Sequence, residues 1–304
     1  MNIIRSTEFQ LNSDTAVAIG KFDGIHRGHR ELLDRIIEKK QAGLEASVFT
    51  FDRSPLELFS GKHIASLTTM EEKIRIFKYL GVDNLIIYPL TRESAAISPL
   101  DYIINILCKQ MRMKYIAAGT DLSFGDKGMG NAELLAEYSN KYDYDVEIID
   151  KLIIEGDEVS SSLIRDLISA GDMEKVSRLI GVPYAVSGEV LHGRRLGRRM
   201  GFPTVNIEIS KDKLLPPYGV YFTEVSIEGK HFNGITNIGS KPTVTDSDTI
   251  FAETNILDFN EDVYGKYITV KLLRFERPEK KFSSVVELKG QIEMDIRKGK
   301  EFFS

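Results

Sequence analysis

Two histidines, His26 and His29, lie in a glycine-rich segment near the start of the chain. The segment, residues 20–29, reads Gly-Lys-Phe-Asp-Gly-Ile-His-Arg-Gly-His; an apolar run at 16–19 precedes it, and leucines and isoleucines at helical spacing follow it. This order predicts a strand, a turn and the start of a helix. The backbone amides of such a helix start suit a phosphate group. Two imidazoles beside them can stabilise the charge that develops when a phosphate anhydride breaks.

The spacing within this segment separates it from other phosphate-binding motifs. Glycines at 20, 24 and 28 allow a ligand to approach the backbone closely, and histidines three residues apart would share one face of a helix. No Gly-Lys-Ser/Thr follows, as a P-loop requires, and the glycines do not have the Gly-x-Gly-x-x-Gly spacing of dinucleotide folds. A chance meeting of histidines and glycines is the alternative. The position at the first strand-to-helix turn, where open α/β sheets bind ligands, favours a site.

Two later segments follow predicted strands and supply further polar groups. Residues 119–131 read Gly-Thr-Asp-Leu-Ser-Phe-Gly-Asp-Lys-Gly-Met-Gly-Asn, which by composition is also compatible with an ordinary flexible loop. Residues 159–165 read Val-Ser-Ser-Ser-Leu-Ile-Arg. Serines cap helices, but hydroxyls together with Arg165 at a helix start also suit a triphosphate. Both functions stay open on these residues alone.

Residues 188–206 read Gly-Glu-Val-Leu-His-Gly-Arg-Arg-Leu-Gly-Arg-Arg-Met-Gly-Phe-Pro-Thr-Val-Asn. The four arginines fit a solvated face, a nucleic-acid patch or a phosphate clamp. The interleaved glycines suit backbone contact with phosphates. Thr204 and Asn206 alternate on a predicted strand, so their side chains point to the same side, and their oxygens suit Mg²⁺.

The order of the predicted elements divides the chain into two parts. In the first part strands alternate with helices, which predicts a parallel sheet with helices on both faces and ligands at the carboxyl ends of its strands. The expected strands are 16–19, 46–51, 84–88, 115–118 and 146–149, and the expected helices are 28–41, 70–80, 99–111 and 131–141. Gly181-Val182-Pro183 ends the helical pattern. Six short strands then predict an antiparallel barrel, at 185–191, 203–207, 220–227, 231–237, 251–257 and 267–275, before a helix around 287–296.

The bulk properties bound the class of protein. The 304 residues are enough for two domains, and a hydrophobic content of 42% is enough for buried cores. The net charge of −5 argues against broad nucleic-acid binding. One cysteine excludes internal disulfides, no apolar run is long enough to span a bilayer, and no signal peptide is seen. We therefore expect a cytoplasmic protein without a membrane partner; the oligomeric state is open, with a monomer as one option.

The motifs together resemble one family, the bacterial bifunctional riboflavin kinase/FAD synthetases. Residues 20–29 are similar to the Gly-x-Phe-Asp-Gly-x-His-x-Gly-His element of nucleotidylyltransferases, and 159–165 to the Ile-Ser-Ser-Thr-x-Ile-Arg element of the adenylyltransferase half. The 119–131 loop is similar to the flavin-side loop of that half, with Leu122 in place of the usual Phe. Residues 188–206 resemble the riboflavin kinase element that ends in Gly-Phe-Pro-Thr-x-Asn. Further matches follow in family order at 217–221, 237–243, 253–259 and 263–265.

The resemblance implies a Rossmann-like FMN adenylyltransferase domain over 1–182 and a riboflavin kinase barrel with a C-terminal helix over 183–304. It implies that riboflavin and ATP give FMN, and that FMN and ATP give FAD and pyrophosphate, with Mg²⁺ in both steps. For adenylyl transfer the implied catalytic residues are His26, His29 and Arg165; the ATP site is Gly20, Phe22, Asp23, Gly24, Gly28, Ser160, Ser161 and Ser162; and the FMN site is Asp121, Phe124 and Gly125. For the kinase the implied base is Glu253; the ATP site is Gly188, Gly193, Arg195, Gly197, Gly201, Pro203, Thr204 and Asn206; and Thr204 and Asn206 bind Mg²⁺.

The two reactions differ in their need for a base. The phosphate of FMN is already an anionic nucleophile, whereas a ribityl hydroxyl must lose a proton as it attacks ATP. One rival is a paralogue with a single activity, adenylyltransferase or kinase, which Leu122 motivates. A second is a catalytically silent flavin-binding regulator, against which His26, His29, Asn206 and Glu253 argue. A nucleic-acid binder that uses the arginine cluster is the most distant alternative.

Overall fold

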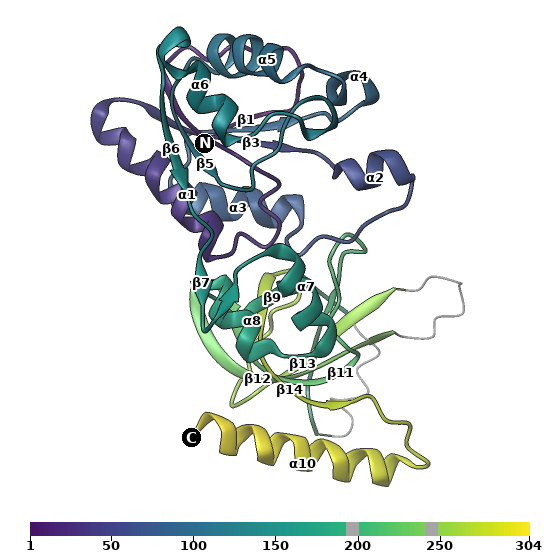
Figure 1. Cartoon of the computed structure of the whole chain (residues 1–304). Coiled ribbons are helices and arrows are strands. Elements are labelled where there is room, and N and C mark those ends of the chain that lie inside the picture. The colour runs from purple at the N-terminus through teal and green to yellow at the C-terminus, as the bar shows by residue number, and fades with distance from the viewer. Residues whose placement is uncertain (193–200, 241–248) are drawn as a thin grey trace. The chain divides into compact units, whose positions relative to one another are not determined.

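The computed structural model describes residues 1–192, 201–240 and 249–304, which form two compact units, Met1–Ser161 and Ser162–Ser304 (Figure 1). Gly193, Arg195 and Gly197, which were predicted to bind ATP in the kinase, lie outside the described residues. The domain boundary at 182/183 stays a prediction; the division into compact units falls at 161/162, and the first barrel strand begins at Tyr184. Every helix in the described ranges is too short or too polar to cross a membrane.

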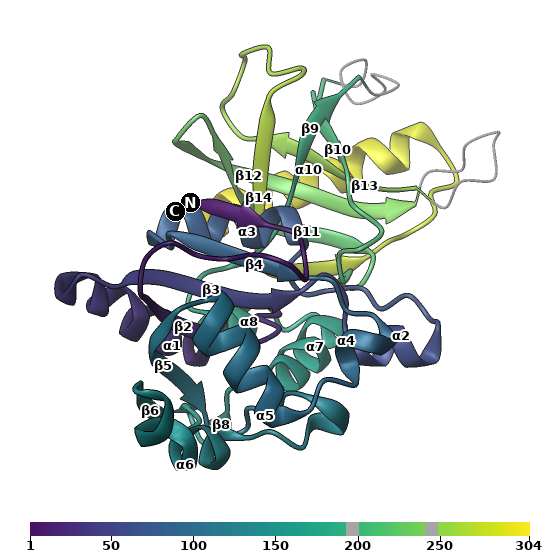
Figure 2. The same cartoon turned by 90° about the horizontal axis from the view of Figure 1, so that it is seen from above.

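The first unit contains a parallel sheet, as predicted. Its order is β1-β4-β3-β2-β5-β6, and Figure 2 shows β4, β3, β2, β5 and β6 side by side. The strands are β1 (Asn2–Ile4), β2 (Thr15–Ile19), β3 (Glu45–Phe51), β4 (Asn84–Tyr88), β5 (Met113–Gly119) and β6 (Asp145–Ile149). The sequence did not predict β1, because three residues are too few for a pattern.

Helices cover both faces of this sheet. Alternate residues of β2 pack into different cores: Ala16 and Ala18 contact one hydrophobic cluster, and Val17 and Ile19 the other. Figure 1 shows α1 and α3 on one side of the sheet and α5 and α6 on the other. The helices are α1 (Arg27–Glu38), α2 (Pro55–Ser60), α3 (Met70–Leu80), α4 (Arg92–Ala95), α5 (Pro99–Asp101) and α6 (Ala132–Tyr142). The predicted helix at 99–111 winds as a π-helix from Tyr102 to Gln110, a difference that apolar spacing alone does not reveal.

The connections place a topological switch point at the centre of the sheet. From β2 the chain runs outward through β3 to β4, and it then returns to the other side of β2 to form β5 and β6. The carboxyl ends of β2 and β5 therefore border the crevice in which open α/β sheets bind ligands. The glycine-rich turn at 20–29 follows β2, and the 119–131 loop follows β5. The fold thus brings two of the predicted motifs to one edge.

The second unit is a closed antiparallel barrel, as predicted, in the order β10-β13-β12-β11-β14-β9. A small hairpin, β7 (Ile153–Ile154) and β8 (Asp157–Glu158), and two helices, α7 (Ser161–Ala170) and α8 (Met173–Ile180), precede it in the chain. The strands are β9 (Tyr184–Leu191), β10 (Val205–Glu208), β11 (Gly219–Ile227), β12 (Lys230–Ser240), β13 (Ile250–Ile256) and β14 (Tyr267–Pro278). Inside the barrel, the hydroxyls of Thr223, Thr236 and Thr254 form a hydrogen-bonded chain with two O–O distances of 2.8 Å.

The C-terminal helix α10 (Val285–Phe303) lies against the outside of the barrel (Figures 1 and 2). Gly299 permits this close approach, because a β-carbon there would lie 2.2 Å from Ile235 Cδ1. Arg277 of β14 donates to both carboxylate oxygens of the buried Asp295, at 2.6 to 3.2 Å. These contacts fix α10 on the barrel. The helix is longer than the segment predicted around 287–296.

Candidate active sites

The turn between β2 and α1 has a strained backbone. Phe22 and Ile25 have φ angles of 48° and 39°, which residues with a β-carbon rarely adopt, and Gly24 has a φ of 90°. Such conformations cost about 1–3 kcal/mol each and persist only where the surroundings fix them. A β-carbon on Gly24 would lie 3.0 Å from Leu67 Cδ1, so lack of space also requires glycine there.

The two histidine rings lie at the end of this turn. They stack with a centroid distance of 3.7 Å. His26 is the N-cap of α1 and not a helical residue, so the expectation that His26 and His29 share one helix face is corrected. The Nδ1 of His26 accepts a hydrogen bond from the backbone N–H of His29 at 3.4 Å. This contact requires an unprotonated Nδ1, which places the proton of neutral His26 on Nε2. The buried Nδ1 of His29 has no hydrogen-bond partner among the described residues.

Burial keeps both imidazoles neutral. It lowers the pKa of His26 from 6.5 to about 4, against the opposing effect of the Asp121 and Asp23 carboxylates. Burial holds the pKa of His29 well below 6.5, and repulsion by a protonated His26 and by the Lys73 ammonium group lowers it further. At pH 7 the pair therefore presents neutral imidazoles with N–H donors beside the helix start, and not two cations.

Neighbouring segments hold the turn from several sides. The Asp23 carboxylate accepts hydrogen bonds from the backbone N–H groups of Leu67 (2.7 Å) and Thr68 (3.4 Å), and Ser161 Oγ donates to the Asp23 carbonyl (2.8 Å). Phe22 is fully buried, and its ring contacts that of His29 at a centroid distance of 5.2 Å. Two more predicted ATP-binding residues lie at the ends of the segment: the Gly20 N–H donates to the Phe49 carbonyl, and Gly28 is in the first turn of α1.

The loop after β5 supplies the predicted flavin-side residues. Phe124 is buried against the ring of Tyr102, 5.2 Å between centroids, and Leu122 packs against the same core cluster. Gly125 has a φ of 70°, and a β-carbon there would lie 3.0 Å from the Pro99 backbone. The Asp121 side chain is 66% exposed, lies 3.8 Å from Lys151 Nζ and raises the pKa of His26. The loop therefore places one exposed carboxylate beside the histidine pair and buries its aromatic ring.

The serine segment lies at the start of α7. Ser160 directly precedes the helix, Ser161 is its first residue, and Ser162 and Arg165 follow within the first two turns. Ser161 belongs to the first unit and contacts the histidine turn as described above, whereas Ser162 and Arg165 belong to the second unit. The structure thus brings Ser161 to the turn.

A second constellation lies on the barrel. Antiparallel register places Glu253 of β13 directly opposite Asn206 of β10 on one side and Asn237 of β12 on the other. Directly paired residues share a face of the sheet, and because Thr254 points into the barrel, this row faces outward. Glu253 is half-buried, and Asn237 donates to Glu279 Oε1 at 3.2 Å. The sequence did not assign a role to Asn237, because its position beside Glu253 depends on strand register.

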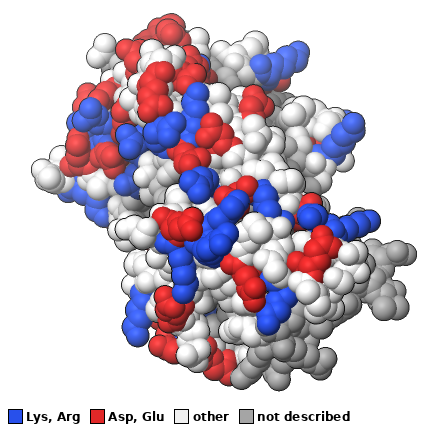
Figure 3. All heavy atoms as spheres, turned by 90° about the horizontal axis from the view of Figure 1, so that it is seen from below, with Lys and Arg blue, Asp and Glu red and all other residues white. Residues whose placement is uncertain are grey.

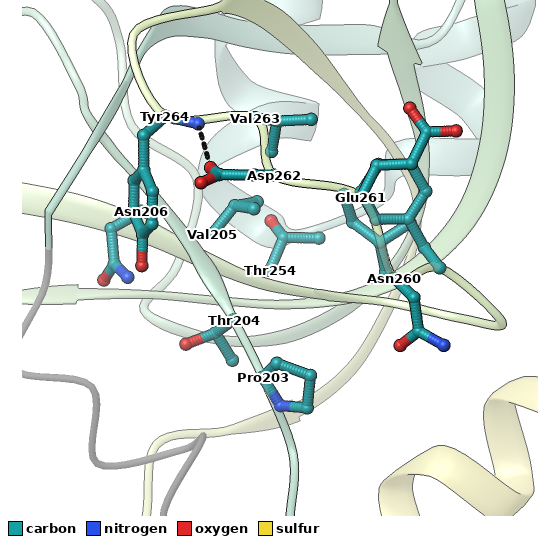
Figure 4. Close-up of a pocket in the computed structure, with 12 residues that line it drawn as sticks. Pro203, Thr204, Val205, Asn206, Thr254, Asn260, Glu261, Asp262, Val263 and Tyr264 are labelled. Atoms are coloured by element: carbon teal, nitrogen blue, oxygen red, sulfur yellow. Dashed lines mark hydrogen bonds between the residues drawn. The ribbon is translucent and has the colours of Figure 1, made fainter.

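Asn206 of this row, but neither Glu253 nor Asn237, lines a cavity of about 270 Å³. Figure 4 shows Thr204 and Asn206 projecting to one side of the chain and Val205 to the other; Thr204 directly precedes β10. Across the cavity lies the 259–264 segment, where Asp262 accepts a hydrogen bond from the Tyr264 N–H at 3.1 Å. Asn255 Nδ2 donates to the Pro203 carbonyl at 2.8 Å and so fixes the segment that carries Thr204. Gly201 has a φ of 92°; Gly188 lies on β9 and does not line this cavity.

The donors at this cavity fit Mg²⁺ bound together with a nucleotide. A hydroxyl and an amide oxygen are hard ligands, but two neutral ligands do not make a protein cage. In residues 1–192, 201–240 and 249–304, no group of three or more His, Cys, Asp or Glu side chains is arranged to hold a metal. This donor set suits an ion that takes most of its ligands from phosphates and water.

Comparison with known proteins identifies the family. A sequence model described as FAD synthetase matches residues 8–163, and one described as riboflavin kinase matches residues 180–303. The chain belongs to the bifunctional riboflavin kinase/FMN adenylyltransferase family. Relatives of that name from Listeria monocytogenes and Escherichia coli K12 are 34% and 37% identical, over 98% and 94% of this chain and 96% and 92% of theirs.

A solved structure has the same two-part architecture. It covers 98% of both chains with 29% identity and a TM-score of 0.84, and its title is "Crystal Structure of Macrolide-efflux Protein from Streptococcus pneumoniae". That title names an activity different from those of the curated relatives. The membership of this chain in the flavin family rests on the two sequence models and those relatives.

The surface charge is mixed. Figure 3 shows Lys and Arg interspersed with Asp and Glu over the face that it presents. The four arginines at 194, 195, 198 and 199, on which a nucleic-acid binder would depend, lie outside the described residues.

Proposed function

We propose that this chain makes FAD in two steps, one in each unit: phosphorylation of riboflavin to FMN by the barrel, and adenylylation of FMN to FAD by the α/β unit. The observation that carries the proposal is that each unit has its own polar constellation suited to one step. The first has the stacked histidines at the sheet's switch point, and the second has the row Asn206–Glu253–Asn237, of which Asn206 lines a cavity. Family membership over nearly the whole chain supports both steps.

In the kinase step the ribityl hydroxyl oxygen of riboflavin attacks the γ-phosphorus of ATP. The bond from that phosphorus to the bridging oxygen breaks, and ADP leaves. The hydroxyl proton goes to the Glu253 carboxylate, which is the only acidic member of the outward row. Asn206 and Asn237, on either side, orient the reactants through their amides. The strand ladder holds the side chains of Asn206, Glu253 and Asn237 in fixed positions relative to one another.

In the adenylyl step a phosphate oxygen of FMN attacks the α-phosphorus of ATP, and pyrophosphate leaves. No proton has to be removed, so the site needs alignment and stabilisation of negative charge instead of a base. The first-turn amides of α1 and the neutral imidazoles of His26 and His29 provide fixed hydrogen-bond donors. Arg165 and the serines at 160–162 belong to the proposed triphosphate site, and Asp121, Phe124 and Gly125 to the FMN side.

We include Mg²⁺ in the proposal, with Thr204 Oγ1 and Asn206 Oδ1 as its protein ligands in the kinase. When bound with ATP, the ion supplies neutralisation of phosphate charge. The proposal also includes a cytoplasmic location, because both steps consume ATP.

Product analysis by chromatography tests the proposal. Purified protein is incubated with ATP and Mg²⁺, first with riboflavin and then, separately, with FMN. We expect FAD from both, with FMN appearing as an intermediate in the first. FMN that accumulates without FAD would leave a kinase alone, and FAD from FMN but no product from riboflavin would leave an adenylyltransferase alone. No product from either would favour the flavin-binding regulator.

A further inference from the structure

Lys73, on α3, is a buried lysine. Only 7% of its surface is exposed, although lysine is among the residues least often buried. A buried ammonium group is costly unless hydrogen bonds compensate for the lost hydration. It lies beside the histidine turn, where its Nζ contacts the Lys21 carbonyl, and its charge lowers the pKa of His29.

The Lys73 ammonium group binds the beginning of the histidine turn. Its Nζ donates to the carbonyl of Lys21 at 2.7 Å. The same carbonyl accepts a weaker hydrogen bond from Thr50 Oγ1 of β3 at 3.4 Å. A charged donor makes a stronger hydrogen bond than a neutral one. The Lys73 contact is therefore the main side-chain support of the peptide group that directly precedes Phe22.

The chain around the start of α3 binds the same turn at a second point. As described above, the Asp23 carboxylate accepts hydrogen bonds from the Leu67 and Thr68 N–H groups. Between the two points, the buried ring of Phe22 packs edge-on against Phe77 of α3, 5.5 Å between centroids. The 67–77 segment thus holds Lys21, Phe22 and Asp23, three consecutive residues. This is the kind of external restraint that a strained backbone requires.

We propose that Lys73 is a positioning residue for adenylyl transfer, which holds the strained turn so that His26 and His29 face the phosphates in fixed positions. The proposal rests on the function proposed above for the first unit. Lys73 acts through the turn, because its ammonium group is bound to a backbone carbonyl. A displacement of the turn by even about 1 Å can slow a reaction that depends on alignment by about 100-fold.

Three variants test this role. Lys73→Met removes both the donor and the charge at similar side-chain length, and Lys73→Gln keeps a shorter neutral donor. Lys78→Met is the matched control, since Lys78 is an exposed residue of the same helix. For FMN adenylylation we expect kcat to fall by about 10- to 100-fold in Lys73→Met and less in Lys73→Gln, with the control unchanged. Phosphorylation of riboflavin by the other unit should be unaffected in all three.

A titration of His29 by NMR gives a readout that does not depend on activity. The titratable groups that affect the pair are His26 and Lys73 at His29, and Asp121 and Asp23 at His26. Loss of the Lys73 charge should raise the pKa of His29 in both variants, whereas Lys78→Met should leave it unchanged. A general loss of stability without a local role would not shift this pKa while the protein stays folded.

The outcomes separate this proposal from the proposed function. If Lys73→Met and Lys73→Gln form FAD at the rate of Lys78→Met and His29 titrates as in the parent protein, Lys73 is not a positioning residue. If the parent protein itself forms no FAD from FMN, the proposed function fails, and the His29 titration still decides whether Lys73 acts on the pair. Should Lys73→Met not fold, Lys73→Gln is judged by the same two measurements.

Discussion

The two sites are held in place by different means. The histidine pair lies at the end of a turn with three positive φ angles. Side chains and backbone groups from several other segments restrain this turn. The row Asn206–Glu253–Asn237 stands on three adjacent strands, where the regular ladder sets the spacing of the side chains. The first site therefore depends on individual tertiary contacts, and the second on strand register.

This difference matches the chemistry of the two steps. The imidazoles of the first site are buried and stay neutral, and the adenylyl step proposed for it uses them as fixed donors to phosphate and requires no base. The proposed kinase step requires a proton acceptor, and the barrel presents Glu253 on an outer face, paired with Asn206, which lines the cavity. The contrast teaches that a strained turn can fix hydrogen-bond donors for phosphate, while a strand ladder can align a carboxylate base with a substrate hydroxyl. Changes at each site should therefore affect one product and not the other.

The largest effect is expected at Glu253. Glu253→Gln keeps the shape of the side chain but removes the proton acceptor, so riboflavin phosphorylation should slow by about 100- to 10,000-fold. Formation of FAD from FMN should not change. Steady-state kinetics with riboflavin and with FMN check this, and FAD formation is the control for folding. An equal loss of both activities in a folded variant would contradict separate sites.

The corresponding change in the first unit is His29→Ala. It removes a fixed donor and the stacking partner of His26, so formation of FAD from FMN should slow by about 100-fold or more. Riboflavin phosphorylation should continue, so FMN should accumulate. Chromatography of the products from riboflavin measures both in one experiment. Undiminished FAD formation would show that the pair is structural.

The same contrast explains which features of each site the sequence could predict. The strand–turn–helix pattern predicted where the histidine turn lies, because hydrophobic periodicity reflects local structure. It did not predict the positive φ of Phe22 or Ile25, or the N-cap position of His26, because these depend on partners such as Leu67 that are distant in the chain.

The barrel was predicted from the spacing of its strands, but not the neighbours of Glu253. Pairing with Asn206 and Asn237 depends on register, and a shift by one residue would point every side chain to the other face. For the same reason the burial of Lys73 was not visible: one lysine in an amphipathic helix looks like any other until the helix is packed. The pattern thus predicts elements and the order of motifs, while long-range contacts complete the sites.

The neutral histidines also predict a pH dependence of stability in the first unit. His26 has a pKa of about 4 when folded and near 6.5 when unfolded. Below pH 6.5 the unfolded chain therefore binds a proton that the folded chain does not, and stability falls as the pH drops from 6.5 to 4, by up to roughly 3 kcal/mol. Denaturant unfolding between pH 4.5 and 7.5 measures this loss.

The matched variant for this prediction is His26→Asn. Asparagine is a good N-cap and does not titrate, so it can replace Nδ1 as the acceptor for the His29 N–H. The variant should lose less stability than the parent protein over the same pH range. An identical loss would show that groups other than His26 cause it.

Gly24→Ala should weaken the first site through its backbone. The φ of 90° and the contact with Leu67 both oppose a β-carbon, so we expect about 1–3 kcal/mol of destabilisation and slower FAD formation. Gly43→Ala is the control, since Gly43 has a φ of 84° but no atom within 4 Å of the added carbon. Equal effects of the two changes on FAD formation would mean that the restraint by Leu67 does not matter.

The smallest effect is expected at Asn255, which tests whether the kinase site depends on register alone. Asn255→Asp removes the donor to the Pro203 carbonyl and places two oxygens near each other, so the segment with Thr204 should loosen. The loss of one hydrogen bond of about 1 kcal/mol should raise the KM for ATP in riboflavin phosphorylation about fivefold, with little change in kcat. Asn233→Asp, at an exposed position of β12, is the control for the added charge.

The split between KM and kcat decides this last test. Because Glu253 stays in its ladder, its alignment with the hydroxyl should survive the loosening of the 203–204 segment. A fall in kcat as large as the rise in KM would mean that the Asn255 contact also positions the reacting groups. The kinase site would then depend on single tertiary contacts in the way that the histidine turn does, and the contrast between the two sites would be one of chemistry only.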